Sequence, residues 1–160
     1  MRNEDEANRA INLYADSVRR ICFMHLKNHS DTEDVFQDVF LKYILYSHTF
    51  ESDEHEKAWI LRVAINCCKD LLKSFFRSRV SSINEIDMNG LSVPEENKEV
   101  LDVVLRLPEK YRDVIYLHYY EGYTAVEIAA IMQKKENTIY TWLSRAKEQL
   151  RNELGGETYG

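Results

Sequence analysis

Five polar side chains recur along one edge of an otherwise apolar stretch, residues 57–79. At 100° per residue in an α-helix, spacings of three and four residues bring them into one narrow stripe. Arginine and lysine are the side chains that neutralise phosphate, and an amide both donates and accepts hydrogen bonds. The five positions are Arg62, Asn66, Lys69, Lys73 and Arg77. The pattern predicts a helix that packs on most sides and offers one basic edge to a partner.

The net charge of the chain argues against a polyanionic partner, but the distribution of that charge does not. The 160 residues carry a net charge of −6, with a pI near 5.4. Residues 57–79 nevertheless sum to +5 and residues 134–151 to +3, while residues 1–56 and 80–133 each sum to −6. Because two basic segments stand in an acidic chain, we expect the local electrostatic potential, and not the net charge, to determine which partner binds.

No motif for catalysis or cofactor binding occurs in the sequence. Because it has no glycine-rich phosphate loop, nucleophile elbow or paired-carboxylate motif, we expect no enzymatic activity, cofactor, metal or small-molecule substrate. His25 and His29 lie one turn apart, but no third ligand has a supporting spacing, and surface histidines are expected. Cys22, Cys67 and Cys68 lack a zinc-binding spacing and are expected to be reduced core residues.

The sequence also lacks the patterns of a secreted or membrane protein. Its first residues, MRNEDEANRA, are polar and acidic, unlike a signal peptide, and no apolar run is long enough to cross a bilayer. We therefore expect a cytoplasmic protein.

Helical periodicity runs through almost the whole chain, and no strand-like alternation is sustained. Residues 80–97 interrupt it with serine, asparagine and acidic residues, and with the breakers Gly90 and Pro94, which is the composition of a linker. A tether of this length inside one compact domain would be unusual. The sequence therefore predicts an all-α protein of two small helical domains, residues 1–79 and 98–160, joined by a flexible acidic linker.

In the first domain we expect helices over residues 5–27, 30–46 and 57–79, with the polar stretch 47–56 before the third. Ser30 and Glu33 have the spacing of a capping box that would begin the second helix. The apolar faces expected on the first two helices are Ala10, Leu13, Tyr14, Val18, Ile21 and Cys22, and then Val35, Val39 and Leu45.

In the second domain we expect a helix over residues 98–107, another from about Pro108, and then a short helix. Thr124 and Glu127 form a capping box at the start of this short helix, and a polar turn over residues 133–137 follows it. The side chains of the short helix available for packing are Val126, Ile128, Ala129, Ile131 and Met132.

The last expected helix, residues 138–153, separates apolar from polar side chains. One face carries Ile139, Leu143, Ala146 and Leu150, the opposite face Thr141, Ser144, Arg145 and Glu148, and one flank Tyr140, Lys147 and Arg151. This is the layout of a helix-turn-helix, whose second helix enters the major groove. An amphipathic helical pair with a merely solvated charged side fits the periodicity equally well.

Three motifs lie in order along these segments. They are D-x-x-Q-[DE] at residues 34–38, W-x-x-R-x-x-x-N-x-x-x-D at residues 59–70 and S-R-A-K at residues 144–147. Any one could arise by chance, but their order and spacing over nearly the whole chain closely resemble the small two-domain bacterial sigma factors of the extracytoplasmic-function group. The resemblance implies a region 2-like domain over residues 1–79 and a region 4-like domain over residues 98–160.

The resemblance implies that the protein binds core RNA polymerase, at its β′ clamp helices and β flap. In this family the acidic and amide side chains of the second helix dock on the clamp helices. The matching residues are Asp34, Gln37 and Asp38, for which an ordinary solvated face is the alternative. The acidic linker is similar to family linkers that run through the RNA exit path, although a disordered tether has the same composition.

The resemblance also implies that the basic stripe lies along the −10 element of promoter DNA. Arg62, Lys69, Lys73 and Arg77 would contact phosphates, and Asn66 would hydrogen-bond an exposed base of the melted strand. Residues 47–56 would form part of a pocket for such a base and contribute to selectivity. Trp59 is either a wedge at the melting edge or, as we expect, a core residue. Asp70 would pair with a neighbouring basic side chain or stabilise the local fold.

The second domain would then bind the −35 element as duplex. Thr141, Ser144 and Arg145 are the base-edge candidates, and Lys134, Lys135, Lys147 and Arg151 the phosphate contacts. Tyr140, which we include in the DNA-binding set, and Trp142 stand where family members often have lysine and arginine. With these two aromatic residues we still expect α-helical binding in the major groove, but the sequence does not indicate which DNA sequence is preferred.

Family members are usually held inactive by an anti-sigma protein, which is often membrane-bound, so we expect such a partner. Two other functions remain alternatives. A stand-alone helix-turn-helix repressor would bind duplex operator without polymerase, but it leaves the basic stripe at 62–77 without a role. The other alternative is a helical regulator that binds polymerase alone.

Overall fold

The computed structural model describes residues 1–78 and 98–154, with the side chains of residues 77, 78 and 98–101 left out. All regular structure in these ranges is helical, which confirms the predicted all-α class. The chain divides into two compact units, Met1–Leu91 and Ser92–Gly160. The predicted linker, residues 80–97, lies outside the described residues. None of the helices in the described ranges combines the length and apolar character that crossing a bilayer requires.

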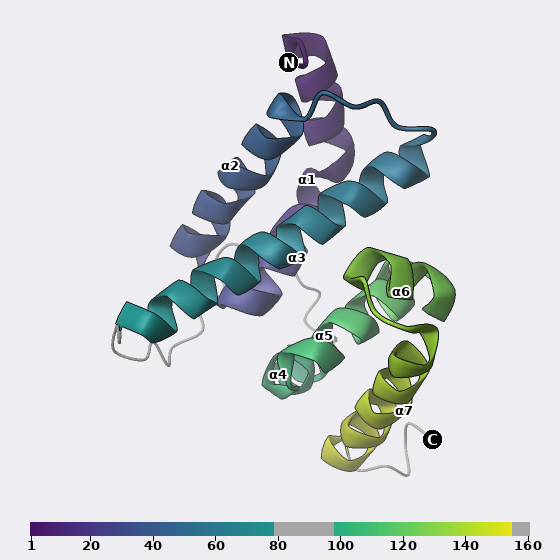
Figure 1. The fold of residues 1–160 in the computed structure, drawn as a ribbon. Helices are drawn as coiled ribbons and strands as arrows, with labels where there is room; N and C mark the ends of the chain where they lie inside the picture. The colour runs from purple at the N-terminus through teal and green to yellow at the C-terminus, as the bar shows by residue number, and fades with distance from the viewer. Residues whose placement is uncertain (79–97, 155–160) are drawn as a thin grey trace. The chain divides into compact units, whose positions relative to one another are not determined.

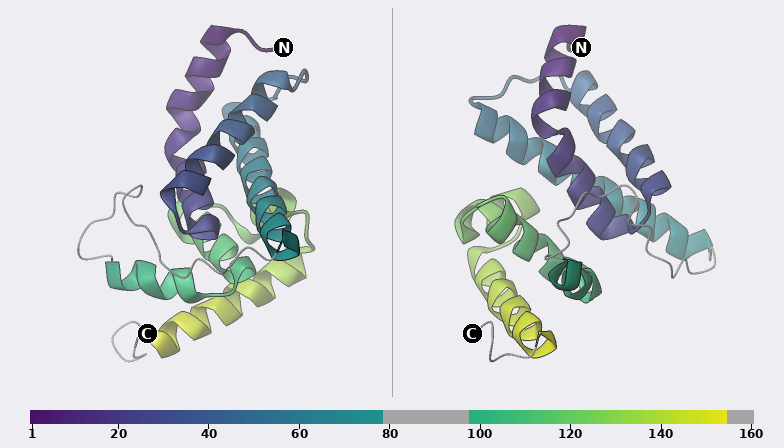
Figure 2. Two further views of the ribbon diagram at one scale, coloured as in Figure 1. Left: turned by 90° about the vertical axis from the view of Figure 1, so that its left-hand side faces the viewer. Right: turned by 180° about the vertical axis from the view of Figure 1, so that it is seen from behind.

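The described residues of unit 1 form three helices, α1 (Glu4–Leu26), α2 (His29–Leu45) and α3 (Asp53–Ser78). Helix α1 packs against both α2 and α3, and α2 also packs against α3 (Figures 1 and 2). Their shared core contains large side chains that are almost fully buried. These are Val18, Ile21, Phe23, Val39, Tyr43, Ile60 and Leu61.

Helix α1 begins and ends with side-chain and backbone caps. The Asn3 side chain accepts a hydrogen bond from the backbone N–H of Glu6 at 2.8 Å, and Lys27 ends the helix in the left-handed conformation with φ of 61°. The predicted apolar face is buried except for Leu13, which is 54% exposed. Ser17 is buried on this side of the helix instead.

Helix α2 begins one residue before the predicted start, so the expected capping box of Ser30 and Glu33 is wrong. The N-cap is Asn28, whose side chain accepts from the backbone N–H of Asp31 at 2.8 Å. Ser30 lies inside the first turn, and the Glu33 carboxylate accepts hydrogen bonds from Arg19 of α1 at 3.0 and 3.1 Å. Leu45, expected in the core, is 59% exposed, whereas Tyr43 is 1% exposed.

Helix α3 begins four residues before the predicted start, at Asp53. The polar stretch therefore supplies the first turn of this helix, and only residues 46–52 connect α2 to α3. Glu56, which lay in the predicted polar stretch, is 6% exposed. It occupies the helix position one turn before Ile60 and two turns before Ala64, both fully buried.

Unit 2 contains α4 (Lys98–Arg106), α5 (Glu109–Ile115), the π-helical turn η3 (Tyr116–Tyr120), α6 (Ala125–Met132) and α7 (Glu136–Glu153). Helix α7 packs against α5 and α6 (Figure 1). Its predicted apolar face is buried at Ile139, Leu143 and Ala146, while Leu150 is half-buried.

The turn η3 continues α5 with a wider hydrogen-bond ring. The backbone N–H of Glu121 donates to the carbonyl of Tyr116 at 3.1 Å, five residues earlier. The rings of Tyr116 and Tyr120 stack at 5.2 Å between centroids. Gly122, with φ of 82°, then turns the chain toward α6.

The short helix α6 begins with the predicted capping box. The Thr124 N–H donates to the Glu127 carboxylate at 2.9 Å, and the Glu127 N–H donates to the Thr124 hydroxyl at 3.2 Å. Gln133 ends α6 in the left-handed conformation, and α7 already begins at Glu136, so the turn is shorter than expected. Val126, expected to pack, is 50% exposed.

Histidine and cysteine placement differs in part from expectation. His29 is exposed, but His25 is 3% exposed, so the expected surface position is wrong for it. His25 lies in the last turn of α1, where its neighbours Met24 and Leu26 are buried as well. Cys22 and Cys68 are buried, Cys67 is half-buried, and all three are free thiols.

Candidate nucleic-acid interface

The basic stripe of α3 lies on the side of the helix away from its buried face. Asn66 and Lys73 are exposed, and Arg62 and Lys69 are half-buried. The opposite side is buried at Ile60, Leu61, Ala64, Ile65 and Cys68. The fifth predicted position, Arg77, belongs to α3, but its side chain lies outside the described part.

The three described cations of the stripe are available for a ligand. Among the residues that the structure describes, Arg62, Lys69 and Lys73 form no ion pair within 4.0 Å. A cation without an internal carboxylate partner keeps its charge for phosphate. The stripe therefore has the exposure and the charge that a polyanion requires.

The acidic and amide side chains of α2 are exposed along one edge of that helix. Asp34, Gln37 and Asp38 all face solvent, with Leu41 (55% exposed) one turn further on. Asp34 and Asp38 also line a groove between α2 and α3, whereas Gln37 does not. The structure thus brings the two aspartates together and directs Gln37 to the outside of the same helix.

The groove between α2 and α3 also contains Cys67, which was expected in the core but is half-buried. Asp70 lines it, together with Lys42, which is one turn after Asp38. Burial raises the pKa of the half-buried Cys67 thiol in this groove, and the nearby Lys42 charge opposes that rise. The Cys67 sulfur is therefore held as an unreactive thiol.

A buried carboxylate joins the three helices of unit 1 at the start of α3. The Glu56 carboxylate accepts hydrogen bonds from Tyr43 at 2.7 Å, Tyr14 at 3.0 Å and Arg9 at 2.9 Å. Arg9 also pairs with Asp53. We call Glu56 and its three donors the Glu56 hub.

The Glu56 hub changes the acid strength of its members. Burial alone raises the pKa of Glu56, but the hydrogen bonds from Tyr43, Arg9 and Tyr14 outweigh burial and hold this pKa below its ordinary value. Burial, followed by the bond to Glu56, raises the pKa of Tyr43 to about 12. Glu56 is therefore ionised and the tyrosines are protonated at neutral pH.

Aromatic rings cover the connection between α2 and α3. Trp59 is half-buried and packs on Tyr46, with ring centroids 4.5 Å apart, and on Phe50 at 5.6 Å. This environment favours the expected core interpretation of Trp59. The side chains of Ser47, His48 and Thr49 remain exposed above the rings. The connection thus has a packed base and an exposed polar tip.

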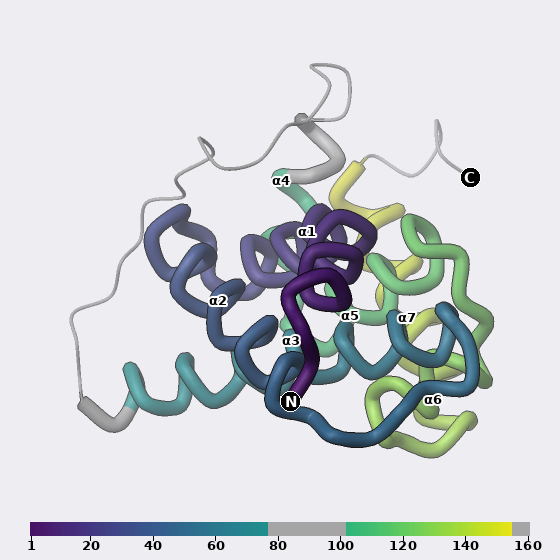
Figure 3. Tube along the Cα trace, turned by 90° about the horizontal axis from the view of Figure 1, so that it is seen from above, coloured from purple at the N-terminus to yellow at the C-terminus, as the bar shows by residue number. Residues whose placement is uncertain are grey.

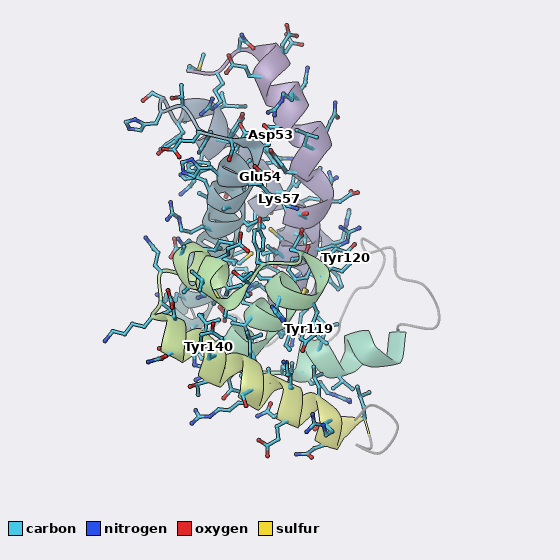
Figure 4. All side chains as sticks on the ribbon, turned by 90° about the vertical axis from the view of Figure 1, so that its right-hand side faces the viewer. Asp53, Glu54, Lys57, Tyr119, Tyr120 and Tyr140 are labelled. Atoms are coloured by element: carbon cyan, nitrogen blue, oxygen red, sulfur yellow. The ribbon has the colours of Figure 1, made fainter. Side chains whose placement is uncertain are left out.

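In unit 2, part of the predicted DNA-binding set lines one groove beside the start of α6. Tyr140, Ser144, Lys147 and Arg151 of α7 line it together with Thr124 and His118. Lys147 also lies over the ring of Tyr119, with its Nζ 5.6 Å from the centroid. Tyr119, Tyr120 and Tyr140 are labelled in Figure 4 and are each more than half exposed.

The other predicted positions of unit 2 are exposed but do not line this groove. They are Thr141 and Arg145 on α7 and Lys134 and Lys135 in the turn before it. Trp142 is half-buried, and Lys110 of α5 lies 5.4 Å from its ring centroid. The base-edge candidates are therefore divided, because Ser144 lines the groove whereas Thr141 and Arg145 lie outside it.

Sequence reasoning missed Glu56 and its partner Arg9, and also Arg2. A usable signal was present, because Glu56 falls in register with the buried positions Ile60 and Ala64. A charged residue on an apolar stripe indicates a buried, paired group. No comparable signal marks the two arginines, whose side-chain hydrogen bonds go to residues more than forty positions away in sequence.

Comparison with known proteins gives matches over both units. The Sigma-70 region 2 family model matches residues 10–78, and the Sigma-70 region 4 model matches residues 97–150. The chain is 26% identical to the ECF RNA polymerase sigma factor SigW of Bacillus subtilis (strain 168), covering 90% of this chain and 86% of SigW. It is 30% identical to the ECF RNA polymerase sigma-E factor of Escherichia coli (strain K12), covering 78% and 74%.

A solved structure shows the same fold. The sigma factor RpoE, crystallised with the anti-sigma factor NepR from Bartonella quintana, matches with a TM-score of 0.76 and 20% identity. The match covers 94% of this chain and 97% of the other. At that identity the likeness is one of fold.

Proposed function

The chain belongs to the sigma-70 family of transcription initiation factors, in its extracytoplasmic-function group, and we propose that it divides promoter recognition between its two units. Members of this group are not enzymes, and they direct RNA polymerase to promoters. We assign residues 1–79 to polymerase binding and the −10 element, residues 80–97 to the linker, and residues 98–160 to the −35 element.

One observation supports this division above the others. The chain has a net charge of −6, yet each unit exposes a separate group of cations, on α3 and on α7 with its preceding turn. Phosphate neutralisation supplies most of the affinity for nucleic acid, so two such surfaces favour contacts with two stretches of one DNA. A repressor that used α7 alone would leave the α3 stripe without a ligand.

For polymerase binding we propose the exposed edge of α2. Asp34, Gln37 and Asp38 would meet basic and hydrogen-bonding groups of the β′ clamp helices, and unit 2 would reach the β flap. Charge complementarity of this kind sets orientation and association rate more than raw affinity.

At the −10 element, α3 and the connection before it would hold the melted strand. Arg62, Lys69, Lys73 and Arg77 would neutralise phosphates, and Asn66 would hydrogen-bond an unstacked base. The exposed side chains of residues 47–49 would read a base that has left the stack. Promoter melting and initiation would follow from capture of this strand by the polymerase-bound protein.

At the −35 element, α7 would enter the major groove of duplex DNA. Thr141, Ser144 and Arg145 would contact base edges, with Tyr140 beside them. Lys134, Lys135, Lys147 and Arg151 would lie on phosphates. The groove next to the start of α6 would then face one DNA strand.

We further propose that an anti-sigma protein regulates this chain, by analogy with the RpoE of Bartonella quintana, which was crystallised with the anti-sigma factor NepR. The protein would act in the cytoplasm, where polymerase works, and a membrane-bound anti-sigma protein would hold it at the membrane.

Pull-down with core RNA polymerase, followed by transcription from a promoter library, tests the proposal. We expect a stable complex that starts transcription at promoters that core polymerase alone does not use. A chain that shifts duplex DNA by itself and starts at no promoter would instead be a repressor. A chain that binds polymerase and starts at no promoter would be a polymerase-binding regulator.

Two sets of variants test the separate surfaces. Asn66→Ala is expected to impair open-complex formation more than polymerase binding, with Ser74→Ala, an exposed polar residue off the stripe, as its control. Gln37→Ala with Asp38→Ala is expected to weaken polymerase binding and leave helix content unchanged. Its control is Asn12→Ala with Asp16→Ala, an exposed amide and acid on α1. Loss of polymerase binding in Asn66→Ala would contradict the assignment of α3.

A further inference from the structure

We infer that the N-terminal end of α1 positions the connection between α2 and α3, residues 46–52, for reading the −10 element. Two arginines, Arg2 and Arg9, hold this connection at its two ends. The inference rests on the proposed function, in which the connection and α3 read the melted strand. It adds positioning residues that the resemblance to sigma factors did not indicate.

Arg2 holds the beginning of the connection. Its Nε donates to the carbonyl of Tyr43 at 3.1 Å, and its Nη2 donates to the carbonyl of His48 at 2.7 Å. Its backbone N–H donates to the carbonyl of Ile44 at 2.9 Å. Figure 3 shows the N-terminus lying beside the chain that leaves α2. One residue thus links the last turn of α2 to the middle of the connection.

The chemistry of a guanidinium group suits this position. The last carbonyls of a helix lack intrahelical partners and carry partial negative charge, so a cation with several N–H donors is favourable there. The Arg2 guanidinium also lies 4.5 Å from the ring centroid of Tyr43 and 5.1 Å from that of Phe50. It therefore fixes the backbone through His48 and the ring of Phe50 together.

Arg9 holds the end of the connection. It pairs with Asp53, the first residue of α3, and donates to Glu56 one turn later at 2.9 Å. The hydroxyl of Tyr14, further along α1, donates to Glu56 and also lies 3.2 Å from the Asp53 carbonyl. Figure 4 labels Asp53 at the end of α3 that receives the connection. The start of α3 is thus fixed to the same helix that carries Arg2 at its N-terminal side.

Between these two attachments the connection exposes side chains while its backbone is held. Ser47, His48 and Thr49 are exposed, yet the His48 carbonyl is bound by Arg2. The His48 ring packs against the Tyr46 ring at a tilted angle, with 5.0 Å between the centroids. A loop that selects one base needs a single conformation, because a mobile loop can adapt to several bases. Arg2 and Arg9 would therefore contribute to sequence discrimination without touching DNA.

The test measures discrimination between promoters. Wild-type protein with core polymerase is first assayed on a promoter that it uses and on versions with single −10 bases replaced. A mismatched base lowers use by roughly tenfold or more in specific protein–DNA recognition. We expect Arg2→Ala to reduce the penalty at one or two −10 positions to about threefold or less, and to leave −35 penalties unchanged.

Arg19→Ala is the matched control. Arg19 also joins α1 to α2, through two hydrogen bonds to Glu33 at 3.0 and 3.1 Å and a guanidinium 4.0 Å from the Phe36 ring centroid. Its loss removes contacts of the same kind away from the connection. We expect this variant to keep every −10 penalty, because lower stability alone reduces use of all promoters equally.

Arg2→Lys is a second variant, chosen because we expect it to fold as the wild type does. Lysine keeps a cation at the end of α2 but lacks the planar fork that reaches two carbonyls. We expect wild-type helix content and thermal stability, together with the reduced −10 penalty of Arg2→Ala. The inference is overturned if both Arg2 variants keep the wild-type −10 penalties. A wild-type protein that starts at no promoter would instead overturn the proposed function.

Discussion

The two units hold their proposed reading surfaces in different ways. In unit 1, the Glu56 hub and Arg2 attach an irregular connection through directional hydrogen bonds between distant residues. In unit 2, the reading surface is a regular helix, placed by buried Ile139, Leu143 and Ala146 and by the capping box that begins α6.

The difference follows from what each surface has to read. A helix is rigid because of its own backbone hydrogen bonds, so apolar packing is sufficient to present α7 to duplex DNA. An irregular segment has no internal ladder of bonds, and only specific polar contacts select one conformation for it. A surface for a melted strand therefore needs a buried polar network, and a surface for a duplex does not.

The largest expected effect comes from removing the centre of the hub. Glu56→Ala leaves the half-exposed Arg9 with only Asp53 and leaves the buried hydroxyls of Tyr14 and Tyr43 without their acceptor. Each buried donor left unsatisfied costs about 1–3 kcal/mol, so the two together cost about 2–6 kcal/mol. We expect a loss of this size in the free energy of unfolding of unit 1. Urea unfolding followed by Trp59 fluorescence, in a Trp142→Phe background, measures it. A loss below about 1 kcal/mol would mean that the hub contributes little.

A comparable truncation in unit 2 is expected to act only there. Ile139 is fully buried between α7 and its neighbours, and truncating such a side chain to alanine costs about 2–5 kcal/mol. The free energy of unfolding measured through Trp142, in a Trp59→Phe background, should fall, while hydrogen exchange in α3 is unchanged. If either variant lowered the free energy of unfolding of both units equally, the contrast between the two units would be contradicted.

Arg145→Ala is expected to affect DNA discrimination and leave stability unchanged. Arg145 is exposed on α7, and loss of a bidentate base contact costs about 1–3 kcal/mol of specificity. Binding to duplexes with each −35 base replaced should show relaxed preference at one position. A uniform loss across all duplexes would identify Arg145 as a phosphate contact.

Thr124→Ala removes half of the capping box and should have a smaller effect. The Glu127 N–H loses its acceptor at 3.2 Å, and such a cap is worth about 1 kcal/mol. We expect that decrease in the free energy of unfolding measured at unit 2, with Thr124→Ser restoring it. If serine fails to restore stability, the hydroxyl bond is not the cause.

The smallest effect near neutral pH concerns the acid stability of the hub. Because the pKa of Glu56 is lower in the folded protein than its ordinary value of 4.5, its ionised form stabilises the fold above pH 4.5, and this contribution disappears as the pH falls through the lower folded pKa. Glu56→Gln should flatten this acid dependence. Thermal unfolding of both proteins across the acid range measures it, and identical slopes would contradict the assignment.

Sequence reasoning succeeded where structure is decided locally. The period of Ile139, Leu143 and Ala146 and the spacing of Thr124 and Glu127 are set within a few residues, and both are confirmed. The start of α2 was mistaken because Asn28 and Ser30 are both good N-caps, and local pattern does not choose between them.

The parts of the site that depend on distant partners could not be obtained in this way. Glu56 finds Arg9 and Tyr14 at separations of 47 and 42 residues, and Arg2 finds His48 at 46. The register of Glu56 with Ile60 and Ala64 indicates that it is buried, but no periodicity connects it to its partners. Burial of a charge is intelligible only once the helices that supply its partners have been brought together.

The π-helical turn η3, Tyr116–Tyr120, determines how the chain can respond to the loss of a residue at this point. The hydrogen bond from the Glu121 N–H to the Tyr116 carbonyl spans five residues, whereas an α-helical hydrogen bond spans four. This turn therefore contains one residue more than a regular α-helix would need. Deleting one residue there would let the segment close into regular α geometry, with α5 and α6 kept in place. We therefore expect a one-residue deletion to be tolerated better in this turn than within α6 or α7.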